Sequence, residues 1–464
     1  MMKAGRAGRA RWIVLSMTLM TTVAIAQPTF AQSPAPKAVY TLKDLIQRTL
    51  ATSPEIRQAQ RGAEVAMAKK DQADAGRFPQ IEVTGIIGPS PRARGTVEDG
   101  SPDRKNHPHV TNVFERVEMR LVQPLYTFGK LTGFREAAEQ GVKVERAKVE
   151  EKAADLILKV KELYYSRLLA SDMLGLIDEV AKDLDKAIDK TERQLKAEAP
   201  GADEMDLYKL KAFRGEVLKN REEAQKGFDL ATGALIFYSG HDRTLPFELD
   251  AVGLEAAPKE VEQADRGAGL ALELRPEMTQ VRAGLKATEA LVKAEESNLY
   301  PHFFAAVNGV YAQAGNRTRQ QNPWAYDPLN DRYTAIVLGF KYELDFGIIR
   351  GKIRAAQAEH LKVGEMKSLA ERGIPLQVRK AHRELAEARE TLRATEEGWR
   401  NAKKWLVAAK ANYDLGVGES RDLGQAAESY ARLRADHYKA MYNHNLALAN
   451  IEYATGLAVK EEMK

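Results

Sequence analysis

The stretch that decides the fold is residues 374–413, which read IPLQVRKAHRELAEARETLRATEEGWRNAKKWLVAAKANY. An apolar or aromatic residue returns at every seventh position along it: Val378, Leu385, Leu392, Trp399, Leu406 and Tyr413. A second row of small or apolar residues lies three positions after the first row, or four before it: Ile374, Ala381, Ala388, Thr395, Ala402 and Ala409. A heptad kept up over this length predicts helices that supercoil around neighbouring helices, and not a helix lying on a globular core.

The helix that carries this pattern is unusually long. If it begins after Phe346-Gly347 it holds close to seventy residues, or about 100 Å at the rise of an α-helix. A second heptad runs earlier in the chain through Leu156, Leu163, Ala170, Ile177 and Leu184. We expect its helix to begin after Phe128-Gly129, to end at Pro200-Gly201 and to be followed by a shorter return helix over 203–240.

The chain is a duplication of one plan. Three pairs of dipeptides recur in the same order at offsets of 222, 218 and 216 residues: Pro54-Glu55 with Pro276-Glu277, Phe128-Gly129 with Phe346-Gly347, and Asp206-Leu207 with Asp422-Leu423. The offset between matching dipeptides changes very little along the chain, which indicates an internal repeat. Each repeat is predicted to contain a helix, two strands, a very long helix, a tip and a return helix. The predicted divisions are a signal peptide (1–31), a first repeat (32–246), a linker or equatorial segment (247–268), a second repeat (269–458) and a C-terminal tail (459–464).

The first 31 residues have the features of a secretory signal peptide. Basic residues precede an apolar run from Trp12 to Ala26, and small residues suit cleavage after Ala26 or after Ala31. Four of the 70 lysines and arginines lie before Trp12, which leaves 66 against 65 acidic residues. The charge balance therefore gives no reason to expect a nucleic-acid partner. The sequence contains no cysteine, so it offers no residue for an N-terminal lipid anchor and no disulfide.

Four segments alternate in the manner of strands with one apolar and one polar face: 80–87, 116–121, 303–311 and 334–344. In the second of them Val117, Met119 and Leu121 point one way, while the intervening residues are charged. Unpaired backbone groups at a sheet edge are costly in hydrocarbon, and closed membrane barrels contain roughly eight or more strands. One chain falls short, so we expect an oligomer. Two copies would supply eight strands and three would supply twelve, and the residues alone leave both open.

The expected fold class is mainly α with a small β part. It consists of a long coiled-coil helical barrel plus four strands per chain that contribute to a shared transmembrane β-barrel. Aromatic residues at the strand–helix junctions are candidates for an interfacial belt facing outer-membrane lipid, although ordinary packing at a joint would place them there too: Phe78, Tyr126, Phe128, Tyr300, Tyr342 and Phe346.

No pattern typical of catalysis stands out. The sequence has no G-x-S-x-G, P-loop or H-E-x-x-H motif and no cysteine. Its abundant acidic residues lie on predicted helical faces beside lysine and arginine. We therefore expect neither an enzyme nor a cofactor or resident metal.

A series of weak motifs, in order on the duplicated frame, is similar to the TolC-like outer-membrane efflux protein family. After the signal peptide they are Tyr40-Thr41-Leu42, Ser53-Pro54-Glu55, QPLYTFG at 123–129, Arg275-Pro276-Glu277, and Tyr-x-x-Gly-x-Gly followed by Asp-Leu within 413–423. The resemblance covers nearly all of the chain beyond the signal peptide. It implies a homotrimer with twelve membrane strands and a helical barrel crossing the periplasm. A periplasmic adaptor protein would dock at its tip and connect it to an inner-membrane pump.

The same resemblance implies roles at the periplasmic tip. Asp206 and Asp422 match aspartates that line the closed constriction, and Tyr413 matches a tyrosine that helps to hold the closed state. Two short segments are candidates for the tip gate and the adaptor-docking surface: Gly416, Val417 and Gly418, and Pro200 with Gly201. The chain departs from the family near Gly418 and at its first tip, so we expect its latch to differ.

These residues also have plainer interpretations. A carboxylate in the first turn stabilises a helix, which would suffice for Asp206 and Asp422, and Gly416-Val417-Gly418 suits a tight turn. The expected function is an outer-membrane channel subunit of a tripartite efflux or type I secretion system, forming a passive exit duct. The alternative is a secreted periplasmic coiled-coil spacer without a pore, which would have no use for the strands. A passive duct takes its specificity from the pump, so the sequence indicates neither the substrate nor whether the pump is proton-driven or ATP-driven.

Overall fold

The computed structural model describes residues 38–93, 110–198, 203–320, 322, 324, 326–415, 417 and 420–462. The predicted signal peptide lies outside this part of the chain. So do Pro200, Gly201, Gly416 and Gly418 from the predicted tip.

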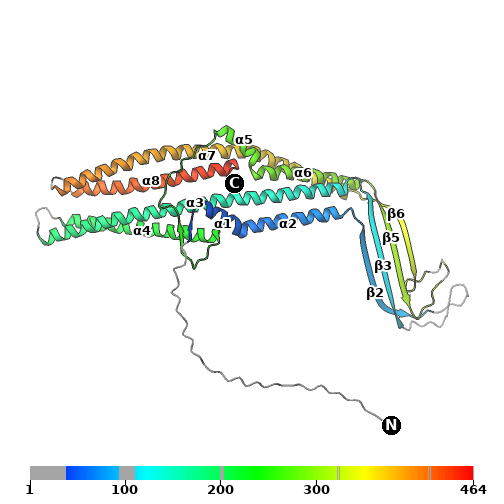
Figure 1. Cartoon of the computed structure of the whole chain (residues 1–464). Coiled ribbons are helices and arrows are strands. Elements are labelled where there is room, and N and C mark those ends of the chain that lie inside the picture. Colours follow the sequence, from blue (N-terminus) through cyan, green and yellow to red (C-terminus); the bar gives the residue numbers. More distant parts are fainter. Residues whose placement is uncertain are drawn as a thin grey trace, which may run out of the picture.

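Four helices form a long rod (Figure 1). α3 (Lys130–Lys196) and α7 (Ile348–Asp414) hold 67 residues each, which corresponds to about 100 Å. α4 (Glu204–Ser239) and α8 (Ser420–Thr455) hold 36 residues each and return along the outer halves of α3 and α7. The equal lengths in the two halves of the chain are the structural form of the predicted duplication.

The inner halves of the long helices are covered by shorter ones. α2 (Pro54–Ala75) packs on α3, and α6 (Pro276–Glu296) packs on both α3 and α7. Each is preceded by an 11-residue helix, α1 (Leu42–Thr52) or α5 (Ala264–Leu274). Each long helix therefore has separate partners along its two halves.

Apolar spacing through Leu45, Leu50, Ile56 and Val65 predicts one continuous helix towards Gly76. This prediction is wrong. The helix breaks at Ser53, which is extended with ψ 128°, because a residue that precedes proline disfavours the α conformation. Ser53 caps α2 by accepting a hydrogen bond from the Glu55 amide at 3.2 Å. Arg275 before Pro276 repeats the break with ψ 132°. The sequence also predicts that Thr41 caps the first helix with Asp44 at its third position. The structure confirms this, because the two residues form a reciprocal capping box.

The middle of the rod carries a small collar. β1 (Ala38–Tyr40) pairs in parallel with β4 (Phe247–Leu249), and α9 (Ala458–Glu462) packs on α3 nearby. β4 and the start of α5 thus lie within the segment predicted as a linker. A one-turn 3₁₀ helix, Ser297–Leu299, follows α6.

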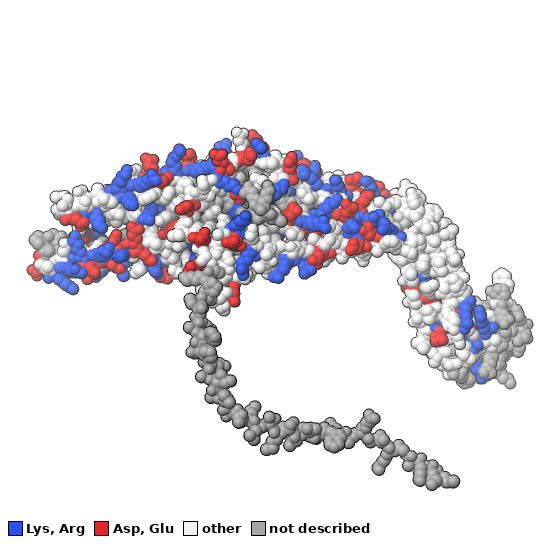
Figure 2. All heavy atoms as spheres, in the orientation of Figure 1, with Lys and Arg blue, Asp and Glu red and all other residues white. Residues whose placement is uncertain are grey.

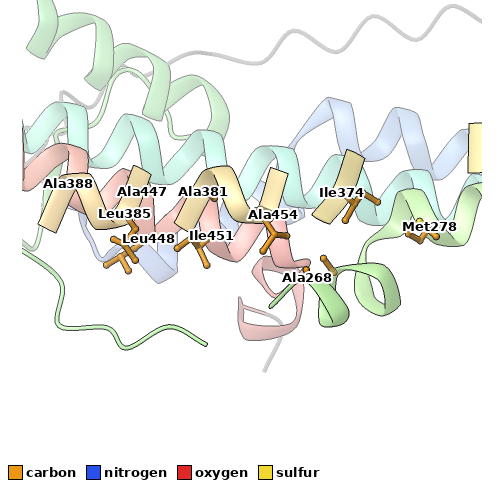
Figure 3. Packing of buried hydrophobic residues seen from close by; sticks show 12 residues of the cluster. Ala268, Met278, Ile374, Ala381, Leu385, Ala388, Ala447, Leu448, Ile451 and Ala454 are labelled. Atoms are coloured by element: carbon orange, nitrogen blue, oxygen red, sulfur yellow. The ribbon is translucent and has the colours of Figure 1, made fainter. Parts of the chain in front are cut away.

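The core confirms the heptad. All twelve heptad residues of α7 are buried or half-buried, and Val378 is fully buried with Leu385 2% exposed. Figure 3 shows these α7 side chains meeting those of α8, α5 and α6, among them Leu448, Ala268 and Met278. The small residues of the second row let the helices approach closely, as knobs-into-holes packing requires.

Four strands extend from one end of the rod (Figure 1). They are β2 (Gln80–Pro91), β3 (Val110–Tyr126), β5 (His302–Ala314) and β6 (Arg332–Lys341), in the spatial order β2-β3-β5-β6 with every neighbouring pair antiparallel. β6 ends at Lys341 and not at the predicted residue 344. None of the helices in the described part of the chain combines the length and the apolar character needed to cross a membrane.

Replacing Val378 by alanine should destabilise the rod, because it removes two buried methyl groups and leaves a cavity. We expect a loss of about 2 kcal/mol in the free energy of unfolding, measured as a lower midpoint of thermal unfolding followed by circular dichroism. The matched control is Val252→Ala, since Val252 is 98% exposed. Equal midpoints for the two variants would contradict this packing.

Candidate functional site

The strand register gives the sheet two different faces. Directly opposed residues on neighbouring strands point to the same side. One row across the four strands is entirely apolar: Ile81, Leu121, Val307 and Ile336. The next row is Glu82, Arg120, Asn308 and Ala335, and it faces the other way. The predicted polar and apolar faces are thus those of one continuous sheet, which we call the polar face and the apolar face.

The apolar face lies open in the single chain. Ile336 is 78% exposed, Leu338 79% and Ile81 63%. Few charged side chains are visible on the sheet near the helices, and they gather toward its far end (Figure 2). Among the described residues, β2 and β6 each pair with a strand on one side only. The sheet therefore has a large uncovered apolar surface and two edges with free hydrogen-bonding groups.

Three of the six predicted junction aromatics come together. The Phe128 ring lies 4.7 Å from that of Tyr126 and stacks on Tyr300 at 4.8 Å between centroids. Phe128 adopts a positive φ of 48° ahead of Gly129, which turns the chain from strand to helix. Phe303, whose ring extends this cluster, was not among the predicted junction aromatics, although its place at the start of a predicted strand was a usable signal.

The other three junction aromatics do not join this cluster among the described contacts. Phe78 is half exposed beneath the Arg77 guanidinium, whose carbon lies 4.9 Å from the ring centroid. Tyr342 and Phe346 are exposed. Aromatic rings thus surround the strand–helix junction as separate groups, which is compatible with either interpretation of them.

At the opposite end of the rod, one contact joins the two repeats. The Lys190 ammonium of α3 lies 4.4 Å from the centroid of the Tyr413 ring on α7 and 4.0 Å from the Asp414 carboxylate. Tyr413 was a predicted tip residue, but its partner Lys190 was missed because no local pattern links residues of different repeats. An open groove of about 530 Å³ runs along the same end of α3, lined by Lys186, Asp189, Lys190, Arg193, Gln194 and Ala197.

The two predicted aspartates lie in the first turns of α4 and α8. Asp206 pairs with Lys209 at 3.1 Å, one helical turn away, while Asp203 caps α4 by accepting from the Met205 amide at 2.9 Å. Asp422 is exposed. Val417 is 79% exposed beyond the end of α7. Both carboxylates thus occupy favourable helix-start positions. These positions are also compatible with the predicted role of the two aspartates at the constriction.

Ion pairs hold the first helical hairpin together near its tip. Arg214 of α4 contacts Asp185 of α3 at 2.6 Å, and Lys211 contacts Glu192 at 2.8 Å. The hydrogen bond from Lys211 lowers the pKa of the Glu192 carboxyl below its usual value. No group of three or more histidine, aspartate or glutamate side chains suited to a metal ion occurs in the described ranges.

The sequence pattern described as "Outer membrane efflux protein" matches residues 45–197 and 268–457. Together these segments make up most of the chain, and each contains one of the two long helices with the strand pair before it. The chain belongs to the outer membrane efflux protein family. The two matched segments include β2, β3, β5, β6 and both long helices.

The chain is similar to a curated protein in sequence and to solved structures in fold. The curated "Probable outer membrane lipoprotein SilC" of Salmonella typhimurium is 25% identical over 260 residues, which span 55% of this chain and only about half, 52%, of that protein. The structure is similar to that of CusC, with a TM-score of 0.74 at 16% identity over 92% of this chain and 95% of that one. The outer membrane protein VceC from Vibrio cholerae has a TM-score of 0.72 at 15% identity, with coverage of 89% and 96%.

Lys190→Ala should loosen the tip of this efflux-family protein by removing the contact between its repeats. We expect the amides at the end of α7, near Tyr413, to exchange their hydrogens with solvent several-fold faster, because local opening no longer breaks that contact. Lys186→Ala is the matched control, since Lys186 pairs with Asp183 on its own helix. Identical exchange in both variants would remove Lys190 from the tip contact.

Proposed function

We propose that this chain is the outer-membrane channel subunit of a tripartite efflux or type I secretion system. Three copies would form a passive exit duct that crosses the outer membrane and extends into the periplasm. The observation that carries this proposal is the sheet register, which puts an unbroken apolar row on one face and a row containing Glu82, Arg120 and Asn308 on the other. That division suits a wall between lipid and a water-filled lumen.

The open edges support a homotrimer. Backbone groups at the free sides of β2 and β6 would each cost several kcal/mol in hydrocarbon. Pairing β6 of one copy with β2 of the next satisfies them, and three copies close a barrel of twelve strands. The exposed junction aromatics, such as Phe346 and Tyr126, would then lie at the membrane interface, where such rings are enriched.

The rod would occupy the periplasm. A signal peptide over 1–31 would direct export, with cleavage after Ala26 or Ala31. SilC is named as a lipoprotein, whereas this sequence contains no cysteine to carry a lipid. We therefore assign its membrane attachment to the strands alone. Catalysis has no part in this function, because a duct lowers no chemical barrier.

The tip would meet a periplasmic adaptor protein and, through it, an inner-membrane pump. In a trimer Asp206 and Asp422 would supply six carboxylates around the constriction, which would favour cations. Tyr413, held by Lys190, would belong to the gate. Gly416, Val417 and Gly418, with Pro200 and Gly201, would form the turns that pack on the adaptor.

The alternative function, a coiled-coil spacer without a pore, would need the same rod but would not need the sheet. A spacer that stayed in water would have to leave Ile336, Leu338 and the rest of the apolar face uncovered. Contiguous apolar surfaces of that kind mark interaction sites. The sheet is therefore the feature that favours the channel.

An arginine in place of Val83 should impair membrane assembly. Val83 lies on the apolar face opposite Met119, and Thr84 beside it lies on the polar face opposite Glu118. Arginine facing lipid costs about 2 kcal/mol or more near mid-membrane. We expect Val83→Arg to reduce the amount of heat-modifiable trimer recovered from the outer membrane, while the neighbouring control Thr84→Arg preserves it. Recovery of the chain without substitutions as a soluble monomer would contradict the proposal that it forms a channel.

The pair Asp206→Ala with Asp422→Ala should change ion selectivity. Removing six carboxylates from a narrow mouth takes away the field that attracts cations. We expect single-channel recordings in asymmetric salt to show weaker cation preference and loss of block by divalent cations. The control is Asp203→Ala, which removes only a helix cap. If the unmodified chain, the double variant and Asp203→Ala all had the same ion selectivity, Asp206 and Asp422 would act only as helix-start residues.

A further inference from the structure

The connection between β5 and β6 lies on one face of the sheet, at the end away from the helices. Arg116 is on the polar face, and its Nη1 donates to the Pro328 carbonyl at 2.5 Å. Ala312, opposite Arg116 on β5, has no exposed surface, and Ala314 is 3% exposed. On the apolar face at the same height Tyr311 is 42% exposed. The connection therefore covers the polar face and leaves the apolar face open.

The connection also crosses the sheet. β3 lies between β5 and β2, yet residues that follow β5 bond directly to β2. Asn316 and Ser90 exchange two hydrogen bonds of 2.8 Å each, and the Thr318 amide donates to the Ala93 carbonyl at 3.0 Å. Ser90 is completely buried by this contact. The chain thus passes over the end of β3 and joins the two repeats at the end of the sheet that lies away from the helices.

A buried ion pair pins the connection in place. Arg317 Nε lies 2.8 Å from an oxygen of Asp327, whose exposure is only 8%. Arg317 Nη1 also donates to the Pro91 carbonyl at 2.9 Å, and the Asn330 side chain donates to the Arg317 carbonyl at 3.0 Å. One guanidinium therefore fastens both limbs of the connection to β2. Breaking such a pair leaves a buried charge without a partner, which strongly opposes loss of this conformation.

We propose that residues 315–320 and 326–331, called the crossing segment, form a fixed constriction inside the external mouth of the channel. This inference rests on the proposed function, because the polar face becomes the lumen wall only in a closed barrel. Three crossing segments would then project into one mouth and set the largest molecule that passes. Arg317, Asp327 and Arg116 act as positioning residues that hold the segment against the wall and fix that limit.

The test uses the absence of cysteine from the chain. Asn308→Cys places a thiol on the polar face opposite Arg120, deeper than the crossing segment. In intact cells, membrane-impermeant maleimides are added from outside, one small and one carried on a polyethylene glycol of several kilodaltons. We expect the small reagent to label the thiol rapidly and the large one slowly. Adding Arg317→Ala or Asp327→Asn should raise the large reagent's rate several-fold without changing that of the small one.

Two further variants make the result specific. Arg332→Ala is the matched control, because Arg332 lies at the same end of the sheet but contacts Tyr311 and Gln313 on the other face. It should leave both rates unchanged. Exchanging the charges, Arg317→Asp with Asp327→Arg, should restore slow labelling by the large reagent. That restoration separates positioning from general damage, and each variant is compared at equal amounts of heat-modifiable trimer.

Failure of this inference and failure of the channel give different results. Equal rates for small and large reagents with the crossing segment intact would overturn the constriction while leaving the channel. The same conclusion would follow if Arg317→Ala and Arg332→Ala had the same effect. No labelling by the small reagent from outside would instead overturn the channel on which the inference rests.

Discussion

The structure depends on one constraint, which is that every backbone N–H and C=O in a non-aqueous layer needs a partner. Within the part of the chain that the structure describes, β2 and β6 each leave one side without a partner strand. In the proposed trimer, β6 of one copy pairs with β2 of the next. The proposed oligomeric state and the proposed lumen both depend on how those two edges are satisfied.

The rod is joined unequally along its length. At mid-height the Glu452 carboxylate of α8 bridges Lys161 of α3 and Lys259, which lies between β4 and α5, each at 2.6 Å. Glu452 and Lys161 are both less than a tenth exposed. A buried pair of this kind costs several kcal/mol to break. The tip contact of Lys190 with Asp414 is 4.0 Å long and exposed, and such contacts contribute little. The ion pairs between the two repeats are thus stronger at the middle of the rod than at its tip.

Much of this could be predicted from local patterns. The heptad identified the buried side of α7 because side chains seven residues apart return to one helical face. Thr41 with Asp44 predicted a helix start, and the alternation in residues 80–87 and 116–121 predicted which side chains share a face of the sheet. The break at Ser53 was equally visible in Pro54, but it was missed because the apolar spacing continues across it. The aromatic cluster was predicted only in part. Phe303 belongs to it, but the pattern indicated Phe303 only as a strand residue.

The sequence by itself determined the periodicities: long helices with a buried seam, strands with two unlike faces, and a plan used twice. These depend on neighbours within a few residues, where backbone geometry alone decides which side chains share a side. The tertiary structure decided which distant residues meet. Lys190 reaches Tyr413, and Arg317 reaches Pro91, across more than two hundred residues. No local period encodes such pairings, because they depend on how the two repeats pack against each other.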